Sequence, residues 1–326
     1  MNRVAERWLD RRTFGAEDLP GPTELAARKR ALGMRVSVCL PALNEEATVG
    51  GIARTVSDYL VGGIGLVDEL VVIDGGSTDR TAAAARAGGA VVLRAQDLLP
   101  EIPWVQGKGE SLWRSLAALT GDVVVWLDAD IRNFAPHFVT RLIAPLVMDQ
   151  SVSFVKGYYR RPLALGEELL PSGGGRVTEL LARPLLNALF PELSGLLQPL
   201  AGEYAGRREV LERVPFFTGY SVEVGLLIDL LYETGLDAIA QVDLEERVHR
   251  NRVLEELAPM AYAIGLTILR RAEEHGRLKA LHDYAALPLM LPDATGRVFA
   301  REITEIERPP YSCRAADNEV DAVLAP

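Results

Sequence analysis

The segment at residues 121–130, GDVVVWLDAD, constrains the fold more than any other part of the sequence. Its β-branched and apolar residues form a run short enough for a buried strand, and the run ends in two carboxylates, Asp128 and Asp130. Because successive residues of an extended chain point to opposite sides, both carboxylates can face the same way at the strand's carboxyl end, where open parallel sheets place ligands. A divalent cation carrying phosphate oxygens would relieve their repulsion. The alternative is a pair of loop aspartates that caps the next helix.

Strand and helix signals alternate on both sides of this segment. The apolar stretches predict strands at residues 35–40, 68–73, 90–93, 152–159 and 238–248, the first of them stopped by Pro41. Between them, the spacing of apolar residues predicts a helix through residues 49–60, an Ala-rich helix capped by Ser77 or Thr78, and a helix opened by Gly107. This alternation indicates an α/β fold with a mostly parallel, Rossmann-like sheet and helices on both faces.

The later part of the chain is less regular. Helices are expected at residues 220–231 and from Leu254 onward, whereas the polar, proline-bearing residues 308–326 are expected to be poorly ordered. A glycine-rich loop, SGGGRVTE at residues 172–179, runs into a helix, so that backbone N–H groups, the Arg176 guanidinium and the Thr178 hydroxyl converge. This arrangement suits a phosphate or a carboxylate. A plain flexible connector is the alternative, because glycine clusters often mark ordinary loops.

The composition limits the possible functions. With 326 residues, 48% of them hydrophobic, the chain can form one large domain with an elaborated C-terminal part. Its net charge of −10 argues against general nucleic-acid binding. The charged N-terminus lacks the apolar core of a signal peptide, and no stretch reaches the ~18 apolar residues of a membrane span. Cys39 and Cys313 make no disulfide framework, so we expect a cytoplasmic protein without a membrane partner.

Several separated motifs resemble the nucleotide-sugar glycosyltransferases of the GT-A fold. They are PALNEE (41–46), DGGSTD (74–79), DAD (128–130) and the late His249. A sharper set, spread over residues 36–257, resembles the glucosyl- and mannosyl-3-phosphoglycerate synthase family: GKGESLWR (107–114), YYRRP (158–162), GGGRVTEL (173–180), LQPL (197–200), GEY (202–204) and HRNR (249–252). The resemblance implies a GT-A glycosyltransferase fold with a C-terminal elaboration that binds the acceptor.

The resemblance also implies a reaction. It is the retaining transfer of a hexose from a nucleoside diphosphate sugar to the 2-hydroxyl of 3-phosphoglycerate. Because no enzyme nucleophile is evident, we expect a front-face (SNi-like) mechanism in which the leaving phosphate oxygen takes the acceptor proton. In the alternative, a covalent double displacement, Glu223 is the one candidate nucleophile.

Residues for the donor and the metal follow from the same resemblance. Asp130 and His249 would hold a divalent metal, Mg²⁺ or Mn²⁺, with Co²⁺ or Zn²⁺ as alternatives, and the metal would stabilise the departing diphosphate. Lys108 would meet the diphosphate or the sugar as a point charge, although a solvated surface is the commoner place for a lysine. The predicted donor-binding residues are Pro41, Leu43, Glu45, Gly75, Lys108, Asp128, Ala129 and Asp130. The catalytic residues would be Lys108, Asp130 and Glu223.

The acceptor carries a phosphate and a carboxylate, so an acidic protein must bind it at a locally basic place. In the family pattern, Gly175, Arg176 and Thr178 fit the phosphate, with Asn251 nearby. Tyr220 and Glu223 would shape the sugar or acceptor end, although Glu223 can equally be a carboxylate on a helix face.

One position bears on the choice of sugar. Relatives that use UDP-glucose often carry a serine where this chain has Gly75, and losing that side chain makes room for a larger purine base. We therefore favour GDP-mannose and the mannosyl product over the alternative, glucose from UDP- or GDP-glucose. Competing classes are a nucleotidyltransferase, a membrane polyprenyl-phosphate glycosyltransferase and a sugar-nucleotide-binding regulator without turnover.

The organisation of the chain follows from these assignments. We divide it into an N-terminal helical extension (1–34), a nucleotide-sugar-binding half (35–150), an acceptor-binding half (151–257), and C-terminal helices with a polar tail (258–326). The extra terminal helices make a homodimer the expected assembly.

Overall fold

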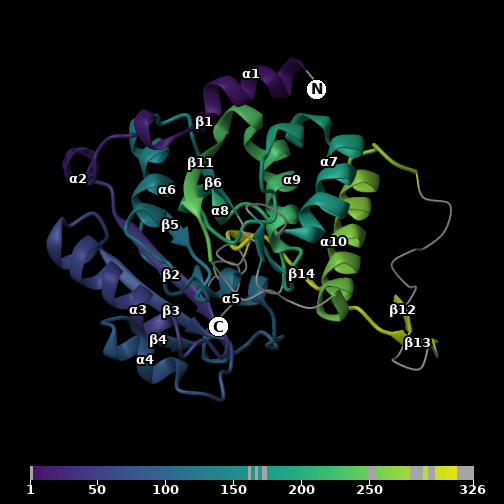
Figure 1. Cartoon of the computed structure of the whole chain (residues 1–326), viewed down its shortest axis with the longest axis horizontal. Coiled ribbons are helices and arrows are strands. Elements are labelled where there is room, and N and C mark those ends of the chain that lie inside the picture. Colours follow the sequence, from purple (N-terminus) through teal and green to yellow (C-terminus); the bar gives the residue numbers. More distant parts are fainter. Residues whose placement is uncertain are drawn as a thin grey trace, which may run out of the picture.

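The computed structural model describes residues 3–160, 163–165, 168–170, 175–248, 254–279, 289–292 and 298–313. One eight-stranded sheet runs through the middle of the molecule (Figure 1), in the order β1-β11-β6-β9-β5-β2-β3-β4. Its strands are β1 (Thr13–Phe14), β2 (Val36–Ala42), β3 (Glu69–Asp74), β4 (Val91–Arg94), β5 (Val123–Trp126), β6 (Phe154–Arg160), β9 (Tyr204–Arg207) and β11 (Ile239–Glu246). Neighbouring strands are parallel except where β9 lies antiparallel between β5 and β6. The predicted mostly parallel sheet is confirmed.

Helices cover both faces of this sheet, as the alternation of signals predicts. One face carries α2 (Pro22–Ala31), α3 (Val49–Thr55) with its π-helical continuation η2 (Val56–Gly63), α4 (Thr81–Ala87) and α6 (His137–Met148). The other carries α1 (Arg3–Arg12), α5 (Lys108–Ser115), η4 (Thr178–Ala182), α7 (Arg183–Leu189), α8 (Arg208–Leu211), α9 (Val222–Thr234) and α10 (Leu254–Glu274). In the part of the chain that the structure describes, no helix combines the length and apolar character needed to cross a membrane.

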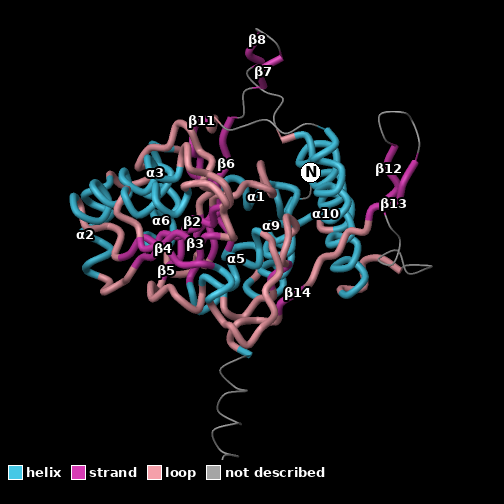
Figure 2. Tube along the Cα trace, turned by 90° about the horizontal axis from the view of Figure 1, so that it is seen from below, coloured by secondary structure: helices cyan, strands magenta, loops and turns pink. Residues whose placement is uncertain are grey.

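Smaller elements connect these layers. The short helices are η1 (Ala16–Asp18), η3 (Ala95–Asp97), η5 (Pro191–Gly195) and η6 (Leu236–Ala238). Three two-stranded sheets pair β7 (Leu163–Leu165) with β8 (Glu168–Leu170), β12 (Leu289–Pro292) with β13 (Val298–Arg301), and β10 (Phe216–Phe217) with β14 (Glu307–Arg308). Figure 2 shows the β7–β8 and β12–β13 hairpins projecting from the body, whereas β14 lies against it.

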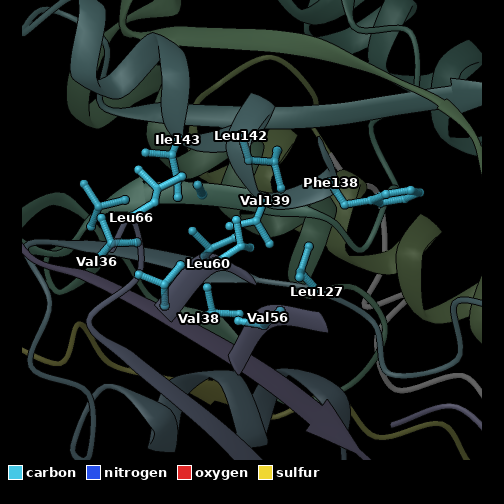
Figure 3. Close-up of a cluster of buried hydrophobic side chains, with 14 of the residues drawn as sticks. Val36, Val38, Val56, Leu60, Leu66, Leu127, Phe138, Val139, Leu142 and Ile143 are labelled. Carbon is cyan, nitrogen blue, oxygen red and sulfur yellow. The ribbon is translucent and has the colours of Figure 1, made fainter. Parts of the chain in front are cut away.

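The core is packed on both faces of the sheet because the central strands are apolar on both sides. Figure 3 shows part of the cluster between β2, η2 and α6, to which Val38, Leu60 and Leu142 belong. On the opposite face Trp113, Trp126 and Phe216 are fully buried. This continuous apolar character is what a strand buried between two helical layers requires.

The N-terminal residues join the main sheet. Strand β1 pairs in parallel with β11, and the buried indole of Trp8 donates its Nε1–H to the carbonyl oxygen of Ile239 at 2.8 Å. Leu25 and Ala26 of α2 are fully buried in the same core as β2. The N-terminal segment therefore extends the sheet at the β11 edge.

Three local predictions are wrong in detail. Strand β2 continues through Pro41 to Ala42, because β5 ends opposite Cys39 and the last residues of β2 pair only with β3. Helix α4 begins at Thr81, so neither Ser77 nor Thr78 caps it. The first residues of the polar tail are packed, because Tyr311 meets the Trp113 ring edge-on with the centroids 6.0 Å apart. Residues 314–326 lie outside the described residues.

Candidate active site

Two loops at the carboxyl ends of β2 and β3 are joined by hydrogen bonds. The backbone N–H of Asn44 donates to Ser77 Oγ at 2.9 Å, and its side-chain Oδ1 accepts the N–H of Thr78 at 2.9 Å. The backbone N–H of Glu45 donates to Thr81 Oγ1 at 2.8 Å. Asn44 has a φ of 57°, a left-handed conformation that asparagine tolerates better than most residues. We call residues 41–46 and 74–81 together the paired loops.

The paired loops bring together several residues predicted to bind the donor. The N–H of Gly75 donates to the carbonyl oxygen of Ala42 at 2.9 Å, which places Gly75 beside Leu43. The Leu43 side chain is 42% exposed next to this backbone. Pro41 lies at the end of β2, on the same edge of the sheet. An exposed apolar side chain beside close backbone is a suitable platform for a flat base.

A third loop, after β5, carries Asp128 and Asp130. Arg247, which follows β11, donates Nη2–H to Asp128 Oδ2 at 2.9 Å and to Asp130 Oδ1 at 2.5 Å. Its Nη1 donates to the Tyr159 hydroxyl at 3.0 Å, and its Nε lies 3.3 Å from Glu203 Oε1. The two aspartates therefore face one spot, and in the described part of the chain a guanidinium lies between them.

Lys108 lies at the centre of a group of charged side chains that we call the ion cluster. Its members are Lys108, Asp128, Asp130, Lys156, Glu203, Glu223 and Arg247. Lys108 opens α5, and its Nζ lies 2.5 Å from Asp128 Oδ1 and 2.7 Å from Glu223 Oε1. Burial by itself would lower the pKa of Lys108, but the carboxylates of Asp128 and Glu223 outweigh it and hold the pKa well above its ordinary value. The lysine therefore keeps its proton at any physiological pH, which excludes it as a general base.

Buried polar residues of β6 and at the start of β9 lie next to this cluster. Lys156, Glu203 and Tyr204 are at most 1% exposed, and Lys156 Nζ lies 4.3 Å from the centroid of the Tyr204 ring. Among the described residues, Lys156 Nζ has no hydrogen-bond partner. Burial lowers its pKa to about 7, although the charge of Glu223 acts in the opposite direction. Burial also raises the pKa of Glu203, against the effect of Arg247.

Close backbone approaches explain some of the glycines in the motifs. A Cβ at Gly202 would overlap the carboxylate of Asp128, so only glycine admits that side chain. Gly107 and Gly109 lie equally close to the carbonyl groups of Thr218 and Phe217. The GKG and GEY motifs therefore bring Lys108 and Asp128 together.

The predicted acceptor residues lie partly within the described chain. Gly175 has a φ of 79°, Arg176 follows it at the start of a helical segment, and Thr178 is 4% exposed. Tyr220 is 41% exposed and lies two residues before α9, whereas Glu223 in the first turn of α9 is 4% exposed. His249 and Asn251 lie outside the described residues, so their predicted roles stay predictions.

The side chains of the site can be compared with the ligands that a divalent metal ion prefers. Among the described residues, no three His, Cys, Asp or Glu side chains form a group that could hold a metal by themselves. Asp130, whose side chain is 32% exposed, offers the hard oxygen that Mg²⁺ and Mn²⁺ prefer. Magnesium commonly binds one or two carboxylates and completes its shell with substrate phosphates and water. The residues present therefore fit a metal that arrives with a diphosphate. The backbone around Asp130 is fixed, because Ala129 O accepts the Thr48 hydroxyl at 2.6 Å.

Sequence reasoning missed much of the ion cluster. Arg247, Lys156 and Glu203 were given no role, and each faces the site from a strand or strand end that is distant in the sequence. A lysine within the apolar run of β6, FVKGYYR, is the one local signal, because a charged residue in a buried strand requires compensation.

Comparisons with known proteins agree with this architecture. Residues 37–213 match the family described as Glycosyl transferase family 2. The chain is 51% identical over 268 residues to the glucosyl-3-phosphoglycerate synthase of Mycolicibacterium smegmatis, covering 82% of this chain and 86% of that protein. It is similar to the solved Mycobacterium tuberculosis glucosyl-3-phosphoglycerate synthase in complex with Mn²⁺, UDP-glucose and phosphoglyceric acid, with a TM-score of 0.80, 45% identity, and coverage of 92% and 98%. The mannosyl-3-phosphoglycerate synthase of Rubrobacter xylanophilus gives a TM-score of 0.86 at 40% identity, with coverage of 95% and 98%.

Proposed function

Since the chain belongs to glycosyl transferase family 2, and within it to the glucosyl- and mannosyl-3-phosphoglycerate synthases, we propose that it transfers glucose from UDP-glucose to the 2-hydroxyl of 3-phosphoglycerate. The enzyme class is that of a hexosyltransferase with a GT-A fold. Support for the substrates comes from the similar M. tuberculosis synthase, which was solved with UDP-glucose and phosphoglyceric acid bound.

The observation that carries the proposal is the ion cluster around Lys108. One ammonium lies within 2.7 Å of two carboxylates, those of Asp128 and Glu223, at the carboxyl edge of the sheet. Lys108 and its two ionised carboxylate partners together carry one net negative charge. Glycosyl transfer passes through a transition state with positive charge on the anomeric carbon, so fixed carboxylates nearby stabilise that state.

The bond changes in the proposed reaction balance without an enzyme base. The bond from the anomeric carbon to the diphosphate oxygen breaks as the bond to the acceptor oxygen forms on the same face. The acceptor proton passes to the leaving phosphate oxygen, which preserves the anomeric configuration. Lys108 cannot act as a base because it keeps its proton, and it holds Asp128 and Glu223 in place while the sugar is bound. The assignment of no general base and no enzyme nucleophile is part of the proposal.

A divalent metal belongs to the proposed function, because the M. tuberculosis synthase was solved with Mn²⁺. Asp130 would hold it, with His249 as the second predicted ligand. When bound, the metal supplies Lewis-acid stabilisation to the departing diphosphate. Arg247 would keep the Asp130 carboxylate oriented from the protein side through its 2.5 Å hydrogen bond.

The sequence-based preference for GDP-mannose is not supported. The glucosyl relatives above favour the alternative, glucose from a uridine donor. The structure explains why Gly75 was a weak guide. A Cβ at this position would lie 3.5 Å from Ala42 O and 3.7 Å from Ser111 Oγ, which are ordinary contacts. A small side chain would therefore fit at this position without displacing its neighbours, so packing does not require glycine here and Gly75 alone does not decide which nucleotide binds. The similarity to the R. xylanophilus mannosyl enzyme keeps mannose as the second candidate.

A donor and acceptor matrix tests the proposal. We expect the purified protein with Mn²⁺ to release UDP from UDP-glucose only when 3-phosphoglycerate is present, and the product to retain the α-configuration by NMR. GDP-mannose should react at least about tenfold less efficiently in kcat/KM, a difference of about 1.4 kcal/mol. Faster turnover of GDP-mannose would replace the proposed donor by the second candidate. Nucleotide-sugar binding without turnover under any combination would indicate a regulator.

A further inference from the structure

The C-terminal segment at residues 305–312, which we call the strap, returns to the catalytic end of the molecule. Its strand β14 pairs antiparallel with β10, with Arg308 opposite Phe216 and Glu307 opposite Phe217. The pairing continues by one residue, because the N–H of Thr218 donates to Ile306 O at 2.9 Å. Figures 1 and 2 show β14 beside α5 and α9. The strap therefore contacts the elements that carry Lys108 and Glu223.

The residues that follow β10 contact the strap on one side and α5 on the other. The N–H of Glu110 donates to Thr218 O at 2.9 Å, and the N–H of Gly109 donates to Gly219 O at 3.3 Å. Side chains at Gly107 or Gly109 would collide with this backbone. The first turn of α5, with Lys108, is thereby docked on residues 217–219, which lead directly into α9 and Glu223.

Glu305 fixes this segment from the strap side. Its carboxylate Oε2 accepts the backbone N–H of Gly219 at 3.0 Å, and a Cβ at Gly219 would overlap the same carboxylate. Burial raises the pKa of Glu305, while the Gly219 N–H acts in the opposite direction. This half-buried acceptor holds the backbone four residues before Glu223.

Arg308 holds α5, the helix that carries Lys108. Arg308 donates Nε–H to Glu110 Oε2 at 2.8 Å and Nη2–H to Glu110 Oε1 at 3.0 Å, a bidentate pair. Glu110 is fully buried, two residues after Lys108, and also accepts Arg114 Nε–H at 2.7 Å. A bidentate guanidinium specifies direction as well as contact. The strap thus anchors the α5 side of the ion pair too.

We propose that Glu305 and Arg308 are positioning residues. Glu305 holds the Gly219 backbone that leads into α9, Arg308 holds the Glu110 side chain in the first turn of α5, and together they set the separation and direction of Lys108 and Glu223. The proposal rests on the proposed function, because it concerns the pair assigned to glycosyl transfer. Glu305 and Arg308 are not themselves catalytic groups. Glu305 acts through the Gly219 backbone and Arg308 through the Glu110 side chain.

Kinetics of Glu305 variants test this proposal. Glu305→Ala should lower kcat about 10- to 50-fold and change KM for UDP-glucose and 3-phosphoglycerate less than about threefold, because misplaced groups weaken the transition state more than substrate binding. Glu305→Gln keeps an oxygen acceptor for the Gly219 N–H and should stay within about threefold of wild type. Glu302→Ala, at an exposed position three residues before Glu305, is the matched control and should be unchanged.

Measuring Glu305→Ala again in a Glu223→Asp variant distinguishes a positioning role from general stabilisation of the fold. Glu223→Asp shortens the carboxylate and already disturbs the pair, so adding Glu305→Ala there should cost less than about threefold in kcat, far below its effect in wild type. A similar measurement with Arg308→Lys, which keeps the charge but loses the bidentate geometry, should show the same non-additivity.

The outcomes are distinct. Equal losses from Glu305→Ala in both backgrounds, equal damage from Glu305→Ala and Glu305→Gln, or an effect no larger than that of Glu302→Ala would each overturn the positioning role. Absence of glucosyl transfer in the wild-type protein would instead overturn the proposed function, and the strap variants are therefore scored only as ratios to an active wild type.

Discussion

The paired loops and the ion cluster lie at the same edge of the sheet, yet they are built from different interactions. The paired loops are joined by hydrogen bonds between backbone N–H groups and short polar side chains, such as Asn44 with Thr78, at exposed positions. The ion cluster is held by charges, with Lys108, Arg247 and Glu203 largely or fully removed from solvent. The paired loops follow two neighbouring strands, β2 and β3, whereas the ion cluster combines residues from α5, the loop after β5, β6, the start of β9, α9 and the end of β11.

This difference predicts how each region responds to change. Removing one neutral hydrogen bond at the surface costs about 0.5–1.5 kcal/mol, because water replaces the lost partner. Removing one member of a buried ion network leaves its partners charged without compensation, which costs about 3–5 kcal/mol. Variants of the ion-paired residues of the cluster should therefore damage folding and catalysis together, whereas variants in the paired loops should act mainly on donor binding.

The largest effect is expected from Arg247→Met. The substitution leaves Glu203 fully buried and removes the contact shared by Asp128 and Asp130, so unfolding should become easier by about 3–5 kcal/mol. Activity should fall about 100- to 1,000-fold. Denaturant melts and UDP-release assays measure both. Arg28→Met, which removes an exposed pair with Glu24, is the control and should cost under about 1 kcal/mol. Equal costs at the two sites would contradict the contrast between buried and exposed charge.

Gly202→Ala should come next. Its new methyl group overlaps the Asp128 carboxylate, so Asp128 must move away from Lys108 and Arg247. We expect about a 10- to 100-fold loss in kcat/KM and a loss of about 1–3 kcal/mol in stability. Gly51→Ala, where a Cβ would meet nothing within 4 Å, is the matched control and should leave activity unchanged. Normal kinetics for Gly202→Ala would show that Asp128 has no fixed position in the reaction.

Lys156→Met should stabilise the protein in a pH-dependent way. The folded pKa of about 7 lies below the ordinary lysine value, so the unfolded chain binds more protons between these two values. The penalty for burying Lys156 is largest below pH 7 and declines as the pH rises through that range. We expect a gain of about 1–3 kcal/mol at pH 6 and a smaller gain at pH 9, measured by urea unfolding. A gain that is larger at pH 9 than at pH 6 would have the wrong sign.

Asn44→Ala should have the smallest effect. It removes the hydrogen bond from Thr78 and places alanine at a φ of 57°, so we expect about 1–2 kcal/mol of destabilisation and about a 3- to 10-fold rise in KM for the sugar nucleotide. Asn44→Gly keeps the left-handed conformation and isolates the hydrogen bond, and it should lose less. An unchanged KM with a lower kcat in both variants would place these loops in the chemical step rather than in donor binding.

The same contrast explains what could be predicted from the sequence. The sheet order cannot be derived from apolar runs, but the strands and most helices can, because burial between two helical layers leaves a plain signal in segments such as VVVW of β5. The paired loops follow directly from motifs beside two predicted strands. Strand β9 was missed, because YAGR is short and contains glycine.

The ion cluster could be predicted only in part. Lys108, Asp128 and Glu223 were singled out, and the structure brings them within ion-pair distance. Arg247 and Lys156 could not be placed, because their partners lie on strands that become neighbours only through the antiparallel insertion of β9. The strap residues from Arg308 onward belong to the tail that was expected to be poorly ordered, since nothing in the local sequence ERPPY reveals that Arg308 will pair with a buried Glu110.

The most direct test of the account is the rate of UDP-glucose turnover by Lys108→Met, measured with saturating 3-phosphoglycerate and Mn²⁺ on protein verified as folded. The substitution removes the charge that joins Asp128 to Glu223 and keeps most of the side-chain volume. We predict a kcat about 100- to 1,000-fold below wild type. A kcat within twofold of wild type would contradict the claim that this ion cluster is where glycosyl transfer takes place.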